Sequence, residues 1–323
     1  MTPVALRTDK LRPEGWKAPA GDLLNAVLLI DKPEGKTSHE TVMEVKRLTG
    51  ADKIGHSGTL DRFASGLLIH CTGPSTKLAR FLLEDDKTYT GTMRLGKSTD
   101  THDREGAVIE EKPVCAVTRE QIMDAAGRFK GKILQVPPRF SALKINGKRA
   151  SDRARDGESV ELAGRMVTIY EFGIYDIDLD AARFRFQVRC SKGTYIRSIA
   201  RDMGRILGTG AYLEALRRTG SGLFSIDQAV TISTLNDYLG GAPVNKSFIV
   251  RPIEALKNYG MIVVTESSRR RILNGACFDI EGAVKIIDKG EKLFIIADED
   301  QNLIAIAEMD IKKWQIKYLN VFK

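Results

Sequence analysis

A lone carboxylate, Asp61, follows a loop whose residue types suit an active site. The loop Gly55–Leu60 supplies two glycines and a pair of hydroxyls, and it stands between an expected helix and the apolar run Leu67–Ile69. Such a loop can hold a reactive carboxylate on rigid flanks, where it could act as a nucleophile or stabilise a cation. Aspartate is also a common turn and cap residue, so a plain turn is the simpler interpretation of this loop alone.

The sequence lacks the signatures of other common catalytic centres. Neither phosphate-cradling glycine motif occurs, and HExxH and GxSxG are absent. The four histidines and four cysteines show no metal-ligand spacing, and no CxxC pair occurs. We therefore expect no metal site and no cofactor.

Helices and strands are expected to alternate irregularly up to residue 247. A capping box at Thr37–Glu40 predicts a helix that ends at Gly50. Three further helices are expected at Ser75–Leu83, from Thr118 to Gly131, and at Thr194–Leu207. Strands are expected at Asn25–Asp31, Thr88–Leu95, Met166–Tyr170, Ile174–Leu179 and Arg183–Cys190. This irregular order predicts an α+β fold rather than a regular βαβ arrangement.

The strand Arg183–Cys190 alternates apolar residues with arginines, which places three arginines on one face. These arginines could be ordinary solvated charges on a half-exposed strand, or they could follow a polyanion. The basic segment Arg139–Arg155 has the same two interpretations.

The pattern changes after residue 247, where five short strand-like runs recur between turns rich in glycine and aspartate. This pattern predicts a small β-barrel. We therefore expect three parts: a flexible extension at 1–24, a catalytic domain at 25–247 and a small β domain at 248–323.

Composition narrows the class of protein. The chain has 323 residues and a net charge of +8, which fits a polyanionic partner without proving one. The longest apolar runs are about five residues, whereas a membrane-spanning helix needs ~20. Four scattered cysteines are expected to be reduced thiols of a cytoplasmic protein.

Several motifs together resemble the TruB family of tRNA pseudouridine synthases. They occur in the order of that family: Leu29–Ser38, Gly55–Asp61, Ala64–Gly66, Gly73–Lys77, Asp86–Tyr89, Thr99–Asp103, Pro137–Lys144, Cys190–Arg197 and Leu216–Arg218. The resemblance implies a mixed-sheet pseudouridine synthase core and a C-terminal RNA-binding domain of the PUA type. It also implies that one uridine in the T loop of tRNA, uridine 55, becomes pseudouridine.

The resemblance assigns roles to particular residues. Asp61 would be the catalytic carboxylate, Arg197 its partner, and Tyr89 the ring that stacks on the uracil. His56 would contact the displaced RNA, while Tyr195 and Leu216 would line the pocket. Three lysines are candidates for phosphate contacts: Lys32, Lys144 and Lys192. The expected partner is the T arm of tRNA, bound by a monomer that needs no other protein.

Two departures from the family pattern are visible. Arg62 stands where proline is usual, which is expected to loosen the turn, and Phe140 stands where tyrosine is commoner. Two other functions also fit the motifs: a guide-RNA-dependent pseudouridine synthase subunit, and a tRNA-folding chaperone whose catalysis is incidental. The small C-terminal domain favours the stand-alone enzyme over the first, and the combination of Asp61, Tyr89 and Arg197 weighs against the second.

Overall fold

The fold is described from a computed structural model, which covers residues 21–141, 143–145, 148–150, 153, 156, 162–310 and 313–322. The expected N-terminal extension, up to residue 20, lies outside the described residues. Most of the chain forms one large mixed sheet with helices on it, and the C-terminal part forms a second, smaller sheet. The expectation of an α+β fold is thus confirmed.

The large sheet has ten strands, and eight of them follow the order β14-β1-β3-β12-β4-β11-β10-β7, with β2 added to β3 and β13 to β12. Their bounds are β1 Val27–Lys32, β2 Ile54–Ser57, β3 Ser65–Thr72, β4 Lys87–Leu95, β7 Gly131–Gln135, β10 Arg165–Asp178, β11 Arg183–Cys190, β12 Ala211–Ser221, β13 Phe224–Ser225 and β14 Ile249–Val250. The pairing of β12 with β3 is parallel, whereas all other pairs in this sheet are antiparallel. The sheet is therefore mixed.

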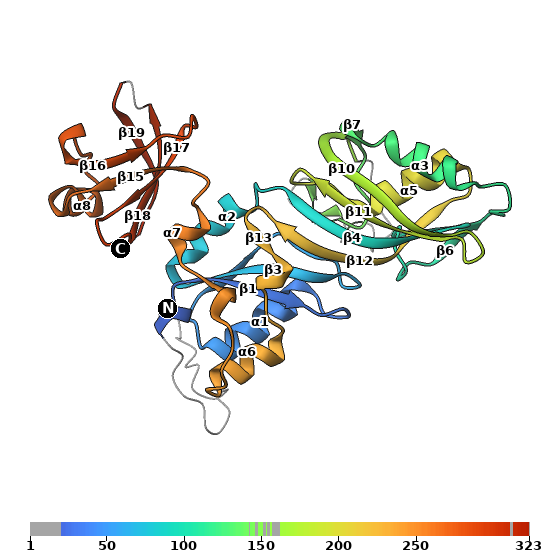
Figure 1. The fold of residues 1–323 in the computed structure, drawn as a ribbon, viewed down its shortest axis with the longest axis horizontal. Helices are drawn as coiled ribbons and strands as arrows, with labels where there is room; N and C mark the ends of the chain where they lie inside the picture. The colour runs from blue at the N-terminus through green and yellow to red at the C-terminus, as the bar shows by residue number, and fades with distance from the viewer. Residues whose placement is uncertain are drawn as a thin grey trace.

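Helices cover the two ends of this sheet. Their bounds are α1 Ser38–Thr49, α2 Ala79–Leu82, α3 Arg119–Gly127, α5 Ile196–Leu207, α6 Ile232–Leu239 and α7 Pro252–Ala255, and a 3-10 helix, η3 Gly73–Leu78, precedes α2. Figure 1 shows α1 and α6 beside β1 and β3, and α3 and α5 beside β10 and β7. Two separate apolar cores follow from this arrangement, one under β1 and β3 and one under β4, β11 and β12.

Two short hairpins stand apart from the large sheet. One joins β5 Lys97–Thr99 to β6 Val108–Glu111, and the other joins β8 Lys144–Ile145 to β9 Lys148–Arg149.

The ends of α1 form as the sequence predicts. The Thr37 hydroxyl accepts a hydrogen bond from the Glu40 amide, and the Glu40 carboxylate accepts one from the Thr37 amide. Gly50 ends the helix with φ at 64°, a conformation that costs glycine little. The expected helix at Ser75–Leu83 forms instead as η3 followed by α2.

Two strand predictions need correction. The runs Met166–Tyr170 and Ile174–Leu179 belong to one long strand, β10, whose pairing with β11 is irregular at two points. Strand β12, which lies between β3 and β4 and joins the two halves of the large sheet, was not expected at all. Its mixture of arginines and small residues gives no clear period-two pattern.

The small domain contains five strands in the order β16-β15-β17-β18-β19. Their bounds are β15 Gly260–Val264, β16 Ala283–Ile287, β17 Leu293–Ala297, β18 Leu303–Asp310 and β19 Gln315–Val321, and α8 Glu266–Leu273 packs beside them. A small β domain is therefore confirmed. Within the residues that the structure describes, β16 and β19 do not pair, so the sheet is open rather than the closed barrel that we expected.

The start of the small domain lies later than we expected. β14 pairs with β1 of the large sheet, and Phe248, Val250 and Ile253 are buried in the core beneath it. The chain therefore leaves the large sheet after α7, and the small domain begins at β15 rather than at residue 248.

The small domain contacts the rest of the protein through η3 and α2. The Lys77 ammonium donates to the Val321 carbonyl at 2.6 Å, and Nη2 of Arg80 donates to the Leu319 carbonyl at 3.3 Å. Phe322 is buried in the same core as β1. In Figure 1 the small domain lies at the left, next to α2 and α7.

Candidate active site

Asp61 lies in the turn between β2 and β3, and α1 holds this turn in place. The Ser38 hydroxyl accepts a hydrogen bond from the Leu60 amide at 2.8 Å and donates one to the Leu60 carbonyl at 3.0 Å. Arg62 adds a second tie, because its Nε donates to the Gly35 carbonyl at 2.8 Å while the Gly35 amide donates to the Arg62 carbonyl at 2.9 Å. The turn is therefore anchored, and the looseness that we expected from the absence of proline is not observed.

Arg197, near the start of α5, binds the Asp61 carboxylate with two nitrogens. Its Nη2 donates to Oδ1 at 3.0 Å, and its Nε lies 2.8 Å from Oδ2. Nη2 also donates a hydrogen bond to the Phe140 carbonyl at 2.9 Å. Because the acceptor is a backbone atom, any residue at position 140 could provide it. The sequence-predicted pair of carboxylate and guanidinium therefore forms in space, across 136 residues of chain.

A second carboxylate, Asp103, also contacts Arg197. Its Oδ2 lies 3.5 Å from Nη1 of Arg197, and its Oδ1 accepts hydrogen bonds from the Thr101 hydroxyl and the Glu105 amide. Burial raises the pKa of the Asp103 carboxyl, while the Thr101 hydrogen bond and the Arg197 charge act against that rise. Arg197 is thus shared between Asp61 and a buried carboxylate.

Asp61 and Arg197 line a cavity of about 600 Å³, within the usual range for ligand sites. Tyr89, Tyr195 and Leu216 line the same cavity, from β4, the residue before α5, and β12. With Lys192, which lines it too, the structure brings together six of the residues that the sequence singled out.

The two tyrosines in the cavity have different surroundings. The Tyr195 amide donates to the Gln135 side chain at 2.8 Å, and the Arg165 guanidinium lies over the Tyr195 ring at 4.7 Å from its centroid. Tyr89 has a raised pKa because its phenol is buried, and the nearby Arg218 charge acts in the opposite direction.

His56 lies on β2, two residues before the cavity wall begins at Gly58. It is directly opposite His70 of β3, and burial lowers the pKa of both imidazoles. The Nδ1 atom of His56 is buried and makes no hydrogen bond within the described residues. His56 is therefore next to the cavity but does not line it.

The three candidate phosphate-binding lysines differ in their exposure and contacts. Lys192 is exposed at the cavity and pairs with Glu84. The side chain of Lys144 lies outside the described residues. The prediction for Lys32 is wrong, because this side chain is 0% exposed and its ammonium donates to the carbonyls of Pro33 and Lys36 at 2.8 and 2.6 Å. Lys32 thus stabilises the loop after β1.

The arginines of β11 do not form a positive track toward the cavity. Val188 of β11 is opposite Tyr89, so the alternating arginines project from the other face of the sheet. Arg183, Arg185 and Arg189 are each paired with a carboxylate, at 3.6, 3.3 and 3.2 Å from Asp178, Asp176 and Asp86. Most side chains of the basic segment 139–155 lie outside the described residues.

Sequence reasoning did not assign a site role to two residues that the structure places here, Asp103 and Arg218. Asp103 closes the motif Thr99–Asp103, whose residue types alone predict no site role. Arg218 follows Leu216 by two residues and lines the cavity. Gly66 is required beside it, because a Cβ at Gly66 would lie 2.3 Å from the Arg218 carbonyl oxygen.

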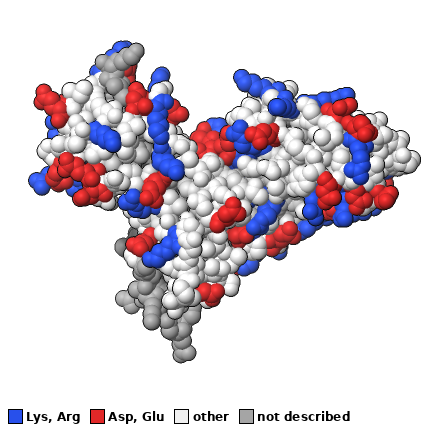
Figure 2. Space-filling view, in the orientation of Figure 1, with Lys and Arg blue, Asp and Glu red and all other residues white. Residues whose placement is uncertain are grey.

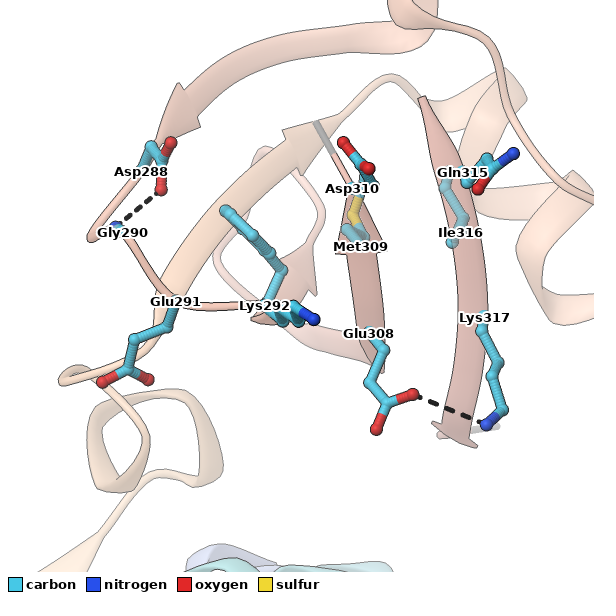
Figure 3. Close-up of a pocket in the computed structure, with 11 residues that line it drawn as sticks. Asp288, Gly290, Glu291, Lys292, Glu308, Met309, Asp310, Gln315, Ile316 and Lys317 are labelled. Carbon is cyan, nitrogen blue, oxygen red and sulfur yellow. Dashed lines mark hydrogen bonds and ion pairs between the residues drawn. The ribbon is translucent and has the colours of Figure 1, made fainter. Parts of the chain in front are cut away.

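A second hollow lies in the small domain, between β18, β19 and the loop before β17 (Figure 3). Acidic and basic side chains both line it, and Lys317 pairs with Glu308 at 3.5 Å. The face shown in Figure 2 likewise intermixes acidic and basic residues over both domains. Four acidic and two basic side chains line it, so the hollow does not offer a positive charge to a polyanion.

The described residues contain neither a metal-binding cluster nor a helix that could span a membrane. No group of three metal-ligating side chains occurs among them. No helix in this part of the chain is long and apolar enough to cross a membrane.

Comparison with known proteins gives consistent matches to one family. Residues 46–196 match the TruB family pseudouridylate synthase N-terminal domain, and residues 197–256 match the tRNA pseudouridylate synthase B C-terminal domain. The chain is 43% identical to tRNA pseudouridine synthase B of Burkholderia lata, over 88% of this chain and 87% of the relative. It is 45% identical to that of Ralstonia nicotianae, over 80% and 82%.

Solved structures with a similar fold agree with this family assignment. The archaeal box H/ACA sRNP Nop10-Cbf5 complex contains a chain that is 26% identical, with a TM-score of 0.71 over 98% of this chain and 93% of that one. A Cbf5-Nop10-Gar1 complex contains one that is 25% identical, with a TM-score of 0.73 over 97% and 90%. The resemblance found in the motifs is thereby confirmed, and the chain belongs to the TruB family of pseudouridylate synthases.

Proposed function

We propose that this chain converts one uridine of tRNA, uridine 55 in the T loop, to pseudouridine. The relatives with 42 to 45% identity that support this substrate are each named tRNA pseudouridine synthase B. The observation that carries the proposal is the placement of Asp61, which is bound to the guanidinium of Arg197 in the wall of a cavity.

The reaction breaks the bond from uracil N1 to ribose C1′ and forms a bond from C5 to C1′. Asp61 is the carboxylate that attacks the nucleoside or stabilises the transient cationic species. Arg197 fixes both oxygens of this carboxylate, and Asp103 fixes Arg197 in turn. No group enters or leaves, because the product is an isomer of the substrate.

The uridine reaches the cavity by leaving its stack in the folded T loop, at a cost of a few kcal/mol. Tyr89 stacks on the uracil, while Tyr195 and Leu216 complete the pocket around it. His56, next to the pocket, contacts the RNA from which the uridine has moved. Lys192, exposed at the same cavity, supplies charge for a phosphate.

The small domain is proposed to be the PUA-type RNA-binding part. We further propose that the protein acts as a monomer in the cytoplasm without a protein partner. The absence of disulfides among the four cysteines is compatible with this location.

One other function has an observation in its favour. The structural neighbours belong to H/ACA ribonucleoprotein complexes, so a guide-RNA-dependent synthase subunit is a second candidate. Identity to those chains is 25 to 26%, well below the identity to the tRNA pseudouridine synthase B relatives, which favours the stand-alone enzyme.

The test uses the purified full chain and an unmodified tRNA transcript, without guide RNA or added protein. Cyanoethylation followed by mass spectrometry should find one pseudouridine, at position 55, and none in a matched transcript with cytidine at that position. If the enzyme modifies neither the transcript nor a T-arm hairpin, or acts only when a guide RNA is added, the proposal is wrong.

A further inference from the structure

Arg218 occupies the junction between the strand of Tyr89 and the turn of Asp61. In the pairing of β12 with β4, Arg218 is directly opposite Tyr89, and in the pairing of β12 with β3 it is beside Gly66. Directly opposed residues in an antiparallel pair place their side chains on the same face, a few ångströms apart. Arg218 therefore shares the cavity face with Tyr89.

The guanidinium of Arg218 is buried, with the residue only 1% exposed. Its Nε donates to the Leu67 carbonyl at 2.6 Å, and its Nη2 donates to the Gly58 carbonyl at 3.1 Å. Gly58 lies three residues before Asp61, and Leu67 lies on β3 just after the turn. Arg218 therefore ties together the two ends of the turn that carries the catalytic carboxylate.

Arg217, the preceding residue on the same strand, provides an internal comparison. It projects from the opposite face and binds both oxygens of Asp31, at 3.0 and 2.7 Å. Arg218, in contrast, has no carboxylate within ion-pair distance among the described residues. Arg217 thus forms an ordinary ion pair, whereas Arg218 is a buried cation that donates to two backbone carbonyls.

A buried cation without a carboxylate is an expensive way to stabilise a fold, because an apolar side chain of similar size often serves as well or better. Such groups are more common where a site needs a fixed charge. Tyr89 is the polar group in the cavity that this charge faces across the β12–β4 pair. The position of Arg218 thus indicates a function in the site rather than in the core.

We propose that Arg218 is a positioning residue for the reaction, which orients the Tyr89 hydroxyl and favours its anionic form while it holds the turn of Asp61. The inference rests on the proposed function. After the C5–C1′ bond has formed, one proton must move from C5 to N1. The Tyr89 phenol gives its proton to N1, and the phenolate so formed, stabilised by Arg218, accepts the proton from C5, so the phenol is restored and the composition of the base is unchanged.

The charges around Tyr89 support this role for Arg218. Burial raises the pKa of the phenol, and Arg218 opposes this through its charge and a hydrogen bond. Cys190 of β11 and Asp61 act in the same direction as burial. Lys87, two residues earlier on β4, is a second buried cation at the cavity, and its own pKa is lowered to about 8 by burial.

The test compares three full-length variants: Arg218→Met, Arg218→Lys and the matched control Arg217→Met. In each variant, position 89 carries a fluorinated tyrosine, whose phenol is more acidic and therefore titrates at a pH at which the protein remains folded. The ¹⁹F NMR signal of this residue is measured against pH without RNA, which gives the pKa of the phenol. We expect Arg218→Met to raise the pKa of this phenol by at least one unit, Arg218→Lys to restore most of the difference, and Arg217→Met to leave the pKa unchanged.

Single-turnover pseudouridine formation and tRNA affinity are measured on the same variants with the natural tyrosine. Arg218→Met should lose about 100-fold in rate at saturating tRNA with the dissociation constant within threefold, while Arg217→Met keeps both. Three results would overturn the proposal: an unchanged phenol pKa, an equal loss of rate in the two methionine variants, or a loss of affinity with the saturating rate intact.

Two complications have their own controls. If Arg218→Met does not fold, Arg218→Gln is compared with Arg218→Lys, and equal phenol pKa values in those two variants contradict the proposal. If the wild type does not modify tRNA at all, the proposed function fails, whereas the phenol titration still decides whether Arg218 acts on Tyr89.

Discussion

Asp61 and Arg197 form an ion pair whose two members differ in exposure. The Arg197 side chain is 6% exposed, whereas the Asp61 side chain is 39% exposed and lines the cavity. The guanidinium is therefore the fixed member, held also by the carbonyls of Thr101 and Phe140. A carboxylate that is oriented from behind and open in front can approach a substrate without losing its partner.

The buried carboxylate behind this pair leads to the first prediction. Asp103→Asn keeps the size of the side chain but removes the charge that faces Arg197. We expect the single-turnover rate to fall by about 100-fold, or ~2.7 kcal/mol, with tRNA affinity within threefold, because Arg197 then holds Asp61 less firmly.

Asp202→Asn is the matched control for this substitution. Asp202 is on the same helix as Arg197 and pairs with Arg201 at 2.8 Å, but it does not line the cavity. Its rate should stay near that of the wild type. A folded Asp103→Asn enzyme with an unchanged rate would show that Asp103 is not needed to position Arg197.

The domain boundary leads to the second prediction. A chain that ends at Tyr259 keeps β14 and α7 in the large sheet and its core, which a chain that ends at residue 247 would lose. We expect tRNA binding to weaken by at least about tenfold, or ~1.4 kcal/mol, while the saturating single-turnover rate stays within threefold, because every residue that lines the cavity precedes Thr219.

Thermal melting must first show that this shortened chain folds, since it removes Phe322 and other small-domain residues from the core under β1 and β3. A folded chain without any saturating rate would contradict the prediction and would indicate that the small domain takes part in the chemistry.

A buried histidine leads to the third prediction. His70 is 0% exposed, and burial lowers its pKa from 6.5 to about 3. Between these values the unfolded chain binds a proton that the folded chain does not, so stability is lost as the pH falls through that window. When the pH is lowered from 7 to 5, the free energy of unfolding of His70→Leu should therefore rise by about 2 kcal/mol relative to that of the wild type.

Denaturant unfolding at several pH values measures this difference. His39→Leu, at an exposed position on α1, is the control and should follow the pH dependence of the wild type. If the free energies of unfolding of His70→Leu and wild type differ by the same amount at every pH down to 5, the buried neutral imidazole is not the cause of the acid sensitivity.

The sequence predicted best where the signal is local. The capping box at Thr37, the stop at Gly50 and the five C-terminal strands depend on neighbouring residues and appear close to their expected positions. Barrel closure depends instead on the pairing of β16 with β19, which are not consecutive in the chain, so the local pattern could not show that these strands are unpaired among the described residues.

The candidate site was predictable in part for the same reason. Asp61, Tyr89 and Arg197 stand in recognisable motifs, but the partnership of Arg197 with Asp103 and the burial of Lys32 depend on long-range packing. The central strand β12 carries Arg218 and shows no clear alternation, because it contacts neighbours on both sides and projects arginines from both faces.

The most direct measurement compares Asp61→Asn with the wild type. Asparagine keeps the reach of the side chain but supplies neither the charge nor a competent nucleophile. Since it also leaves Arg197 without this partner, thermal melting is measured first. Gel-shift affinity and pseudouridine formation are then measured on one preparation. The account predicts a dissociation constant within about tenfold of wild type, or ~1.4 kcal/mol, and no detectable pseudouridine. A folded variant that keeps its rate within tenfold of wild type would contradict the account.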